Sequence, residues 1–224
     1  LCLSRSLQKG EAWWDHFTQV ELPFWSVYER GGGGATKRAV ESWLDGVAPW
    51  SPNREPQDVK RYYDAGGNGV AMRVLPHVLR LGEKEFPKIA TNIFLDGIAT
   101  HGHPRALLGA LAYGFALWAA FRKDSKLAYG ELVEELIKNV DLWSALPATP
   151  SIPPEWRSQA EKSLQNYMKL WESAKAEVME YLEVCRAELS KGALSLDDDV
   201  LKKLQCFNST ISGAGTVAAI ASVY

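Results

Sequence analysis

Three glycines and an asparagine stand directly before a predicted helix, in the run Gly66-Gly67-Asn68-Gly69. Glycine lets a ligand approach the backbone closely, and the first N–H groups of a helix are free to bind an anion such as phosphate. The Asn68 amide both donates and accepts hydrogen bonds, so it is able to orient a ribose hydroxyl. The run therefore predicts either a phosphate- and sugar-binding loop or a plain tight turn with an asparagine cap.

Two of the four histidines, His101 and His103, stand two residues apart at the start of another predicted helix. A His-x-His pair can bind a metal ion, but no third histidine or cysteine has a suggestive spacing. The positive end of a helix favours the neutral form of a histidine, which can then donate to a phosphate or a hydroxyl group. The alternative is one capping and one solvated histidine. A third, His77, matches no motif and is predicted to lie on a helix surface.

Helices must position these segments, because apolar residues recur at helical spacing through most of the chain. No stretch shows the period of two that is typical of strands. Four prolines exclude a helix over 144–154, and residues 48–66 are predicted to form a long polar loop. We therefore predict one all-α domain, with helices at 4–7, 11–20, 35–44, 87–100, 104–121, 127–141, 155–190 and 197–204, and with helical patterns after 68 and after 215.

The composition is that of a soluble globular protein, since 46% of the 224 residues are hydrophobic and 23% are charged. A formal net charge of −2 gives no electrostatic reason to expect nucleic acid or an anionic membrane as a partner. The longest apolar run, 106–121, lies between two arginines and is shorter than the roughly 20 residues that a membrane span needs. It is therefore predicted to be a helix buried in the core.

The three cysteines are sparse and odd in number, which does not suggest a disulfide framework or a zinc site. A reducing, cytoplasmic location is therefore expected. The chain begins with Leu1 rather than methionine, shows no signal peptide, and ends at Tyr224 within an apolar run. From these two ends we expect a domain that is truncated on both sides.

Taken together, the two segments form a specific pattern. The motif Gly-Asn-Gly-x-x-Met-Arg-x-x-Pro begins at Gly67, and the motif Thr-His-x-His-Pro-x-Ala begins at Thr100. In this order they resemble the ADP-ribosylglycohydrolase family, which includes the dinitrogenase reductase activating glycohydrolases. Two looser similarities, at 28–36 and 215–220, follow the order of the same family.

The resemblance implies an all-α single domain of orthogonally packed helices that hydrolyses the glycosidic bond between ADP-ribose and a protein side chain or small-molecule acceptor. It also implies Mg²⁺ ions in a cleft, held by an acidic motif near the N-terminus and another at the start of a late helix. By the same resemblance, the residues lining the ADP-ribose site are Gly66, Gly67, Asn68, Gly69 and His101. The residues supporting that loop are Met72, Arg73 and Pro76.

The metal-binding motifs depart from the family pattern. Residues 3–7 resemble the run that follows the first acidic motif, so its acids would precede Leu1. In the late motif, Gly213 and Gly215 stand where two aspartates belong, and Thr216 alone remains as a predicted metal ligand. Mg²⁺ usually binds at least one or two carboxylates, so we predict little or no turnover from these residues.

Three functions stay open on this sequence. The first is an Mg²⁺-dependent hydrolase of ADP-ribosylated proteins or small molecules, impaired in these residues. The second is a non-catalytic module that binds ADP-ribose or a related nucleotide. The third is a helical interaction domain in which some of the nine tryptophans contact a partner instead of the core.

Overall fold

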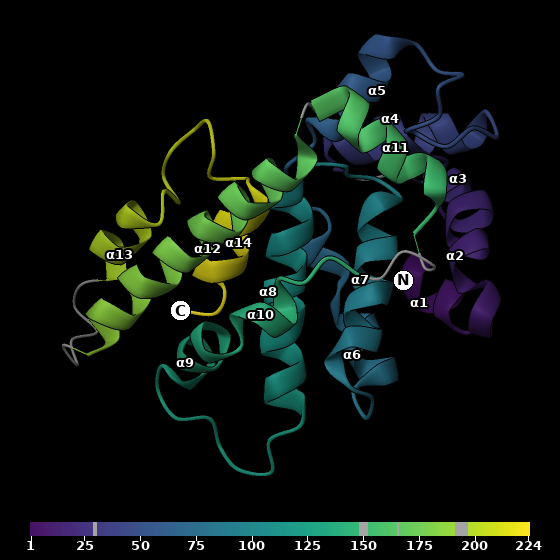
Figure 1. The fold of residues 1–224 in the computed structure, drawn as a ribbon. Coiled ribbons are helices and arrows are strands. Elements are labelled where there is room, and N and C mark those ends of the chain that lie inside the picture. The colour runs from purple at the N-terminus through teal and green to yellow at the C-terminus, as the bar shows by residue number, and fades with distance from the viewer. Residues whose placement is uncertain (29–30, 148–151, 165, 191–196) are drawn as a thin grey trace.

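The computed structural model describes residues 1–28, 31–147, 152–164, 166–190 and 197–224, and it builds them into a packed set of helices (Figure 1). The described residues contain no strand, and Gly67 and Ala214 form an isolated antiparallel bridge between two loops. One contiguous hydrophobic core runs through the molecule. The all-α prediction is therefore confirmed.

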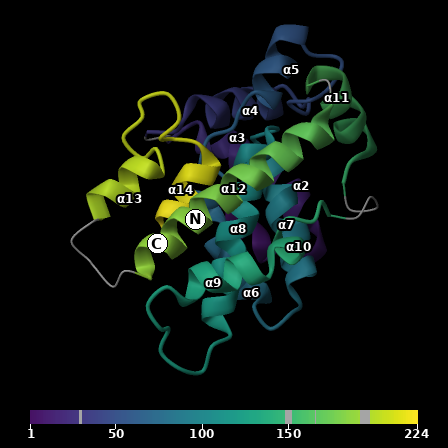
Figure 2. The ribbon, with the colours of Figure 1, turned by 60° about the vertical axis from the view of Figure 1, so that its left-hand side comes forward.

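The helix α8 (Pro104–Phe121) forms the centre of the fold. Pro104 occupies its first turn, and His103 caps it, because His103 Nδ1 accepts a hydrogen bond from the Arg105 N–H at 3.1 Å. Figure 2 shows α12 crossing in front of α8 and α14. The helices that pack around α8 are α6 (Leu75–Leu81), α7 (Phe86–Ile98), α9 (Glu131–Lys138), α12 (Tyr167–Leu189) and α14 (Gly215–Ala221).

Among the described residues, α8 is the one helix that is long and apolar enough to cross a membrane. It is packed against other helices on several sides, and 61% of its apolar window is buried inside the fold. An apolar helix that is enclosed in this way is typical of a globular core. The position of α8 therefore fits the predicted core helix.

Glycines let the starts of α8 and α14 meet with their backbones in contact. A Cβ atom on Gly109 would lie 2.3 Å from the carbonyl carbon of Gly215, and one on Gly215 would lie 2.5 Å from the Arg105 carbonyl oxygen. Both distances are far below van der Waals contact, so a larger residue at either position must push the two helices apart. The crossing thus fixes the position of residues 213–215, which we call the late glycine segment.

The N-terminal helices pack against α7 through tryptophans. Trp14 Nε1 donates to the Leu95 carbonyl at 2.9 Å, and Trp43 Nε1 donates to the Ala99 carbonyl at 2.8 Å. All nine tryptophans of the chain are buried or half-buried, so core packing accounts for them. The elements of this part are α1 (Cys2–Leu7), a 3₁₀ turn (Gly10–Ala12), α2 (Trp13–His16), a π-helical turn (Phe17–Glu21), α3 (Leu22–Trp25) and α4 (Gly34–Leu44).

The prediction of a long loop over 48–66 is wrong in part, because this segment contains α5 (Pro56–Tyr63). Pro56 stands in the first turn, where its missing N–H has no helical partner to lose. Val59, Tyr62 and Tyr63 share the inner face of the helix and are buried. The proline therefore begins this helix instead of excluding it.

The single helix predicted for 155–190 is two helices, α11 (Pro154–Leu164) and α12. Asn166, directly before α12, takes a left-handed φ of 73°, which asparagine tolerates better than most residues. The break lets α11 pack on α5 while α12 packs on α8. Of the predicted non-helical segment 144–154, residues 148–151 lie outside the described residues.

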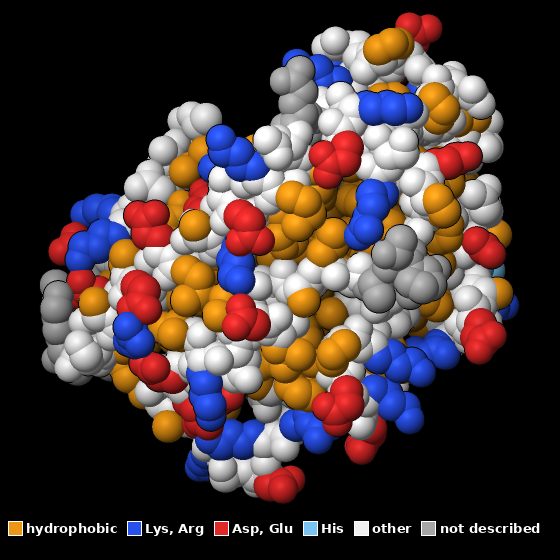
Figure 3. All heavy atoms as spheres, viewed as in Figure 1, with side chains coloured by type: hydrophobic (Ala, Val, Ile, Leu, Met, Phe, Trp, Pro, Cys, Tyr) orange, Lys and Arg blue, Asp and Glu red, His pale blue; other side chains and the backbone are white. Residues whose placement is uncertain are grey.

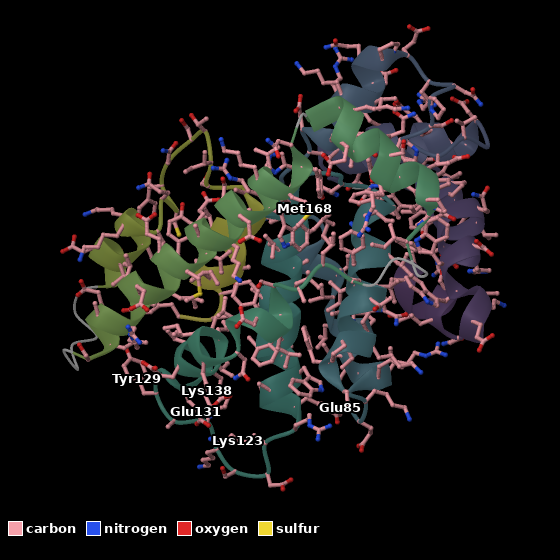
Figure 4. The ribbon with its side chains drawn as sticks, in the orientation of Figure 1. Glu85, Lys123, Tyr129, Glu131, Lys138 and Met168 are labelled. Carbon is pink, nitrogen blue, oxygen red and sulfur yellow. The ribbon has the colours of Figure 1, made fainter. Side chains whose placement is uncertain are left out.

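The remaining helices are shorter than predicted. The segment after Asn68 forms a 3₁₀ turn (Ala71–Arg73) before α6, and the helix predicted over 127–141 divides into α9 and α10 (Val140–Trp143). The helix α13 is Asp197–Lys203. Figure 4 shows Lys123 and Glu131 side by side below α8. The two residues form an ion pair that links the end of α8 to the start of α9.

Candidate functional site

The late glycine segment holds the glycine and asparagine loop in place. The Asn68 N–H donates to the Gly213 carbonyl oxygen, and the Gly215 N–H donates to the Gly66 carbonyl oxygen, both at 2.9 Å. These two bonds lie on either side of the bridge between Gly67 and Ala214. Two segments that are far apart in the sequence thus form one edge of a site.

Several polar groups of this loop are left for a ligand. The Asn68 side chain is half-buried and makes no hydrogen bond within the described part of the chain. The Asn68 carbonyl oxygen accepts from the Met72 N–H at 3.2 Å, so the backbone closes the turn and the side-chain amide does not cap it. The N–H groups of Gly67 and Gly69 likewise have no acceptor among the described residues. Free N–H groups and an amide are donors suited to phosphate and ribose oxygens.

His101 lies directly beneath this loop. A Cβ atom on Gly69 would stand 3.0 Å from His101 Cε1, and one on Gly67 would stand 3.8 Å from His101 Nε2. The histidine is 3% exposed. Its burial, together with the nearby Arg73 guanidinium, lowers the pKa of His101 to about 3. The imidazole is therefore neutral at physiological pH.

Arg73 connects the loop to His101. Its guanidinium donates to the Gly69 carbonyl oxygen at 2.9 Å and to the Thr100 hydroxyl oxygen at 2.7 Å. The Thr100 hydroxyl lies 2.7 Å from His101 Nδ1, and since it accepts from Arg73 its own hydrogen is available to this nitrogen. We therefore assign the ring proton to Nε2, the nitrogen that faces the glycine loop.

A buried acid stands behind this arginine. Asp96 is fully buried and accepts from Arg73 Nε at 2.8 Å, while its other oxygen lies 3.5 Å from His77 Nε2. Burial opposes ionisation of Asp96, but Arg73 and His77 hold the pKa of its carboxyl group below the ordinary value. The prediction that His77 lies on a surface is wrong, because its ring is fully buried and packs edge-on to Trp13 at 5.2 Å.

A groove opens beside the loop. One hollow of about 320 Å³ and a neighbouring hollow of about 580 Å³ share His103 and Arg105 in their walls. Asp64, which follows α5, and Thr210, from the loop after α13, both line the first hollow. Figure 3 shows the outline of the molecule notched beside the loop that follows α13. The second hollow runs along α12 past Glu177.

The predicted metal ligand is bonded to an acid that lines this groove. Thr216 is fully buried, and its hydroxyl donates to Glu177 Oε2 at 3.2 Å. Arg105 Nε donates to the same oxygen at 2.8 Å. The Tyr181 hydroxyl donates to the other oxygen of Glu177 at 3.2 Å. Glu177 is thus held by three donors, one of which carries a permanent positive charge.

These residues do not fit the Mg²⁺ site that the resemblance implies. Within the described ranges no three histidine, cysteine, aspartate or glutamate side chains are placed to hold a metal ion together. Gly213 faces open space, but a side chain on Gly215 would clash with the backbone at Arg105. The acid at this place, Glu177, is already paired with a guanidinium. Mg²⁺ prefers carboxylate oxygens that are free to coordinate it.

The structure brings the predicted ligand-binding residues to one edge: Gly66, Gly67, Asn68, Gly69 and His101. Sequence reasoning missed Asp96, Arg105 and Glu177 as members of the same neighbourhood. The sequence could have pointed to Arg105, because this residue lies inside the Thr-His-x-His-Pro-x-Ala motif. Nothing in the sequence pointed to Glu177 or Asp96, because an acid within a predicted helix is most often solvent-exposed.

Comparison with known proteins identifies the family of this chain. The family model described as ADP-ribosylglycohydrolase matches residues 2–221, nearly the whole chain. No curated protein and no solved structure matches it. The match includes both central motifs and the late glycine segment that holds them, so the chain belongs to the ADP-ribosylglycohydrolase family.

Proposed function

We propose that this chain binds the ADP-ribosyl group of ADP-ribosylated proteins or small molecules in the groove beside residues 66–69. The observation that carries the proposal is the free Asn68 amide above a buried, neutral His101. An amide and a neutral imidazole both suit ribose hydroxyls, and the free N–H groups of Gly67 and Gly69 suit a diphosphate. Membership of a family that acts on ADP-ribosylated substrates supports the same ligand.

Isothermal titration calorimetry of the intact chain with ADP-ribose tests this proposal. We expect Asn68→Ala to weaken binding about tenfold or more, because a hydrogen bond lost from a desolvated site costs ~1–3 kcal/mol. Asn53→Ala is the matched control, since Asn53 is exposed on a connection away from the groove, and it should bind like the wild type. A wild-type chain that is folded by circular dichroism and binds no ADP-ribose would contradict the proposal.

Hydrolysis of the glycosidic bond is a second candidate function, favoured by the family match. We propose that these residues support little or no turnover, because the carboxylate in the groove is paired with Arg105 and two positions of the late motif are glycine. The release of ADP-ribose from an ADP-ribosylated peptide, measured with and without Mg²⁺, tests this. Rapid release that depends on Mg²⁺ would show that the chain is an active hydrolase.

A further inference from the structure

Arg105, which lines both hollows of the groove, places a positive charge there. The Arg105 side chain is 40% exposed, and its Nε donates to Glu177. Its two Nη groups have no hydrogen-bond partner among the described residues. They are therefore available to a ligand, and a guanidinium can hold a phosphate through two parallel hydrogen bonds.

Glu177 fixes the direction of this guanidinium. The carboxylate is 14% exposed and accepts from Thr216 on one oxygen and from Tyr181 on the other. Because both oxygens are held, Glu177 can orient Arg105 without a large loss of side-chain freedom on binding. The same hydrogen bonds occupy the two oxygen-bearing side chains, Glu177 and Thr216, that a metal ion at this place would need.

The remaining charges of the groove leave Arg105 as its dominant cation. Asp64 and Glu180 also line the two hollows, but both are exposed, so water and salt screen their charges. Burial and the charge of Arg105 lower the pKa of His103, which keeps this ring neutral. Among the residues that the structure describes, Arg105 is the only lysine or arginine that lines either hollow.

We propose that the Arg105 guanidinium takes the place of a divalent cation in this groove, where it binds the diphosphate of the ADP-ribosyl group, so that ligand binding needs no Mg²⁺. The inference rests on the proposed function. It adds a charged group that binds the phosphates beside the N–H groups of Gly67 and Gly69, and it removes the metal requirement that the family resemblance implies. The pairing of Glu177 with Arg105 makes the metal and the arginine alternatives, and the backbone contact at Gly215 leaves no room there for an acidic side chain.

Calorimetry with ADP-ribose, in excess Mg²⁺ and in excess EDTA, tests the metal requirement on the wild-type chain. We expect the same dissociation constant in both solutions. Binding that occurs only with Mg²⁺ would overturn this inference while leaving the proposed function standing. The absence of binding in both solutions would overturn both.

Substitution of Arg105 tests the role of the guanidinium. We expect Arg105→Gln to weaken ADP-ribose binding more than about tenfold and Arg105→Lys to restore part of the loss, because a lysine keeps the charge but not the two-pronged geometry.

Two further variants serve as controls. Arg105→Gln leaves Glu177 without its charged partner, so the double variant Arg105→Gln with Glu177→Gln removes that unpaired acid and should bind as weakly as the single variant. Arg122→Gln, at the other end of α8, is the second control and should bind like the wild type. If Arg105→Gln also binds like the wild type, the inference is wrong.

Discussion

At the scale of single residues, Arg73 connects the glycine and asparagine loop, residues 66–69, to the interior. Its guanidinium contacts the Gly69 carbonyl, the Thr100 hydroxyl and the Asp96 carboxylate at 2.7 to 2.9 Å. Asp96 is fully buried, and a buried charge depends strongly on its partner. The placement of the loop and of His101 therefore depends on an acid that has no contact with the proposed ligand.

Replacement of Asp96 tests this dependence. We expect Asp96→Asn to lower the free energy of unfolding by about 3 kcal/mol, because it leaves the Arg73 guanidinium inside the fold without a counter-charge. Its affinity for ADP-ribose should fall as well, because Arg73 no longer holds both Gly69 and Thr100. Urea unfolding and calorimetry measure the two effects.

The matched control is Asp141→Asn. Asp141 also forms an ion pair, with Lys175, but its side chain is 95% exposed. Exposed pairs contribute about 0–1 kcal/mol, so the control should unfold close to the wild type. Equal stability of the Asp96 and Asp141 variants would contradict the role given to Asp96.

At the scale of elements, the crossing of α8 and α14 decides where the two motifs meet. Gly109 and Gly215 give the two backbones room to touch, and the Gly215 N–H then reaches the Gly66 carbonyl oxygen at 2.9 Å. The loop of residues 66–69 is thus hydrogen-bonded to the start of α14, which lies at the other end of the sequence. A change in this crossing should disturb both stability and binding.

We expect Gly109→Ala to lower the free energy of unfolding by about 1–3 kcal/mol, because the added methyl group would stand 2.3 Å from Gly215 and must force the helices apart. Gly213→Ala is the control, since a Cβ atom there meets nothing within 4 Å. Chemical denaturation measures both variants. A Gly109→Ala chain as stable as Gly213→Ala would show that the crossing tolerates a side chain.

The elements also show which helices could be predicted from local sequence patterns. Helical periodicity and the proline at the start of α8 predicted the core helix within a few residues. The same kind of reasoning failed at α5, which lies within a segment predicted to be a polar loop, and at Asn166, where a left-handed residue divides a long apolar pattern. Both errors arise because tertiary packing decides whether a weak local signal begins, breaks or continues a helix.

At the scale of the whole molecule, the buried His101 makes stability depend on pH. Folding lowers its pKa from the ordinary value near 6.5 to about 3. The unfolded chain therefore binds a proton below pH 6.5 that the folded chain excludes, and stability falls as the pH drops from 6.5 towards 3. The half-buried His103, whose pKa is also lowered, acts in the same direction.

We expect the free energy of unfolding to fall by up to ~1.4 kcal/mol per pH unit in this range through His101. Urea unfolding at a series of pH values measures the slope. His101→Gln removes one titrating group and should make the slope shallower. A variant with the slope of the wild type would mean that His101 is not the group excluded from protonation.

Local sequence pattern was enough to predict the all-α class and the family, because both depend on residues close together in the chain: helical periodicity, glycine-rich turns and short motifs. The family resemblance also predicts that Gly213 and Gly215 stand where the late motif has acids. Only the tertiary structure decided that Asp96 is buried behind Arg73 and that Arg105 and Thr216 share Glu177. The physical reason is that the burial of an acid and its choice of partner are set by helices that come from distant parts of the sequence, which no local spacing records.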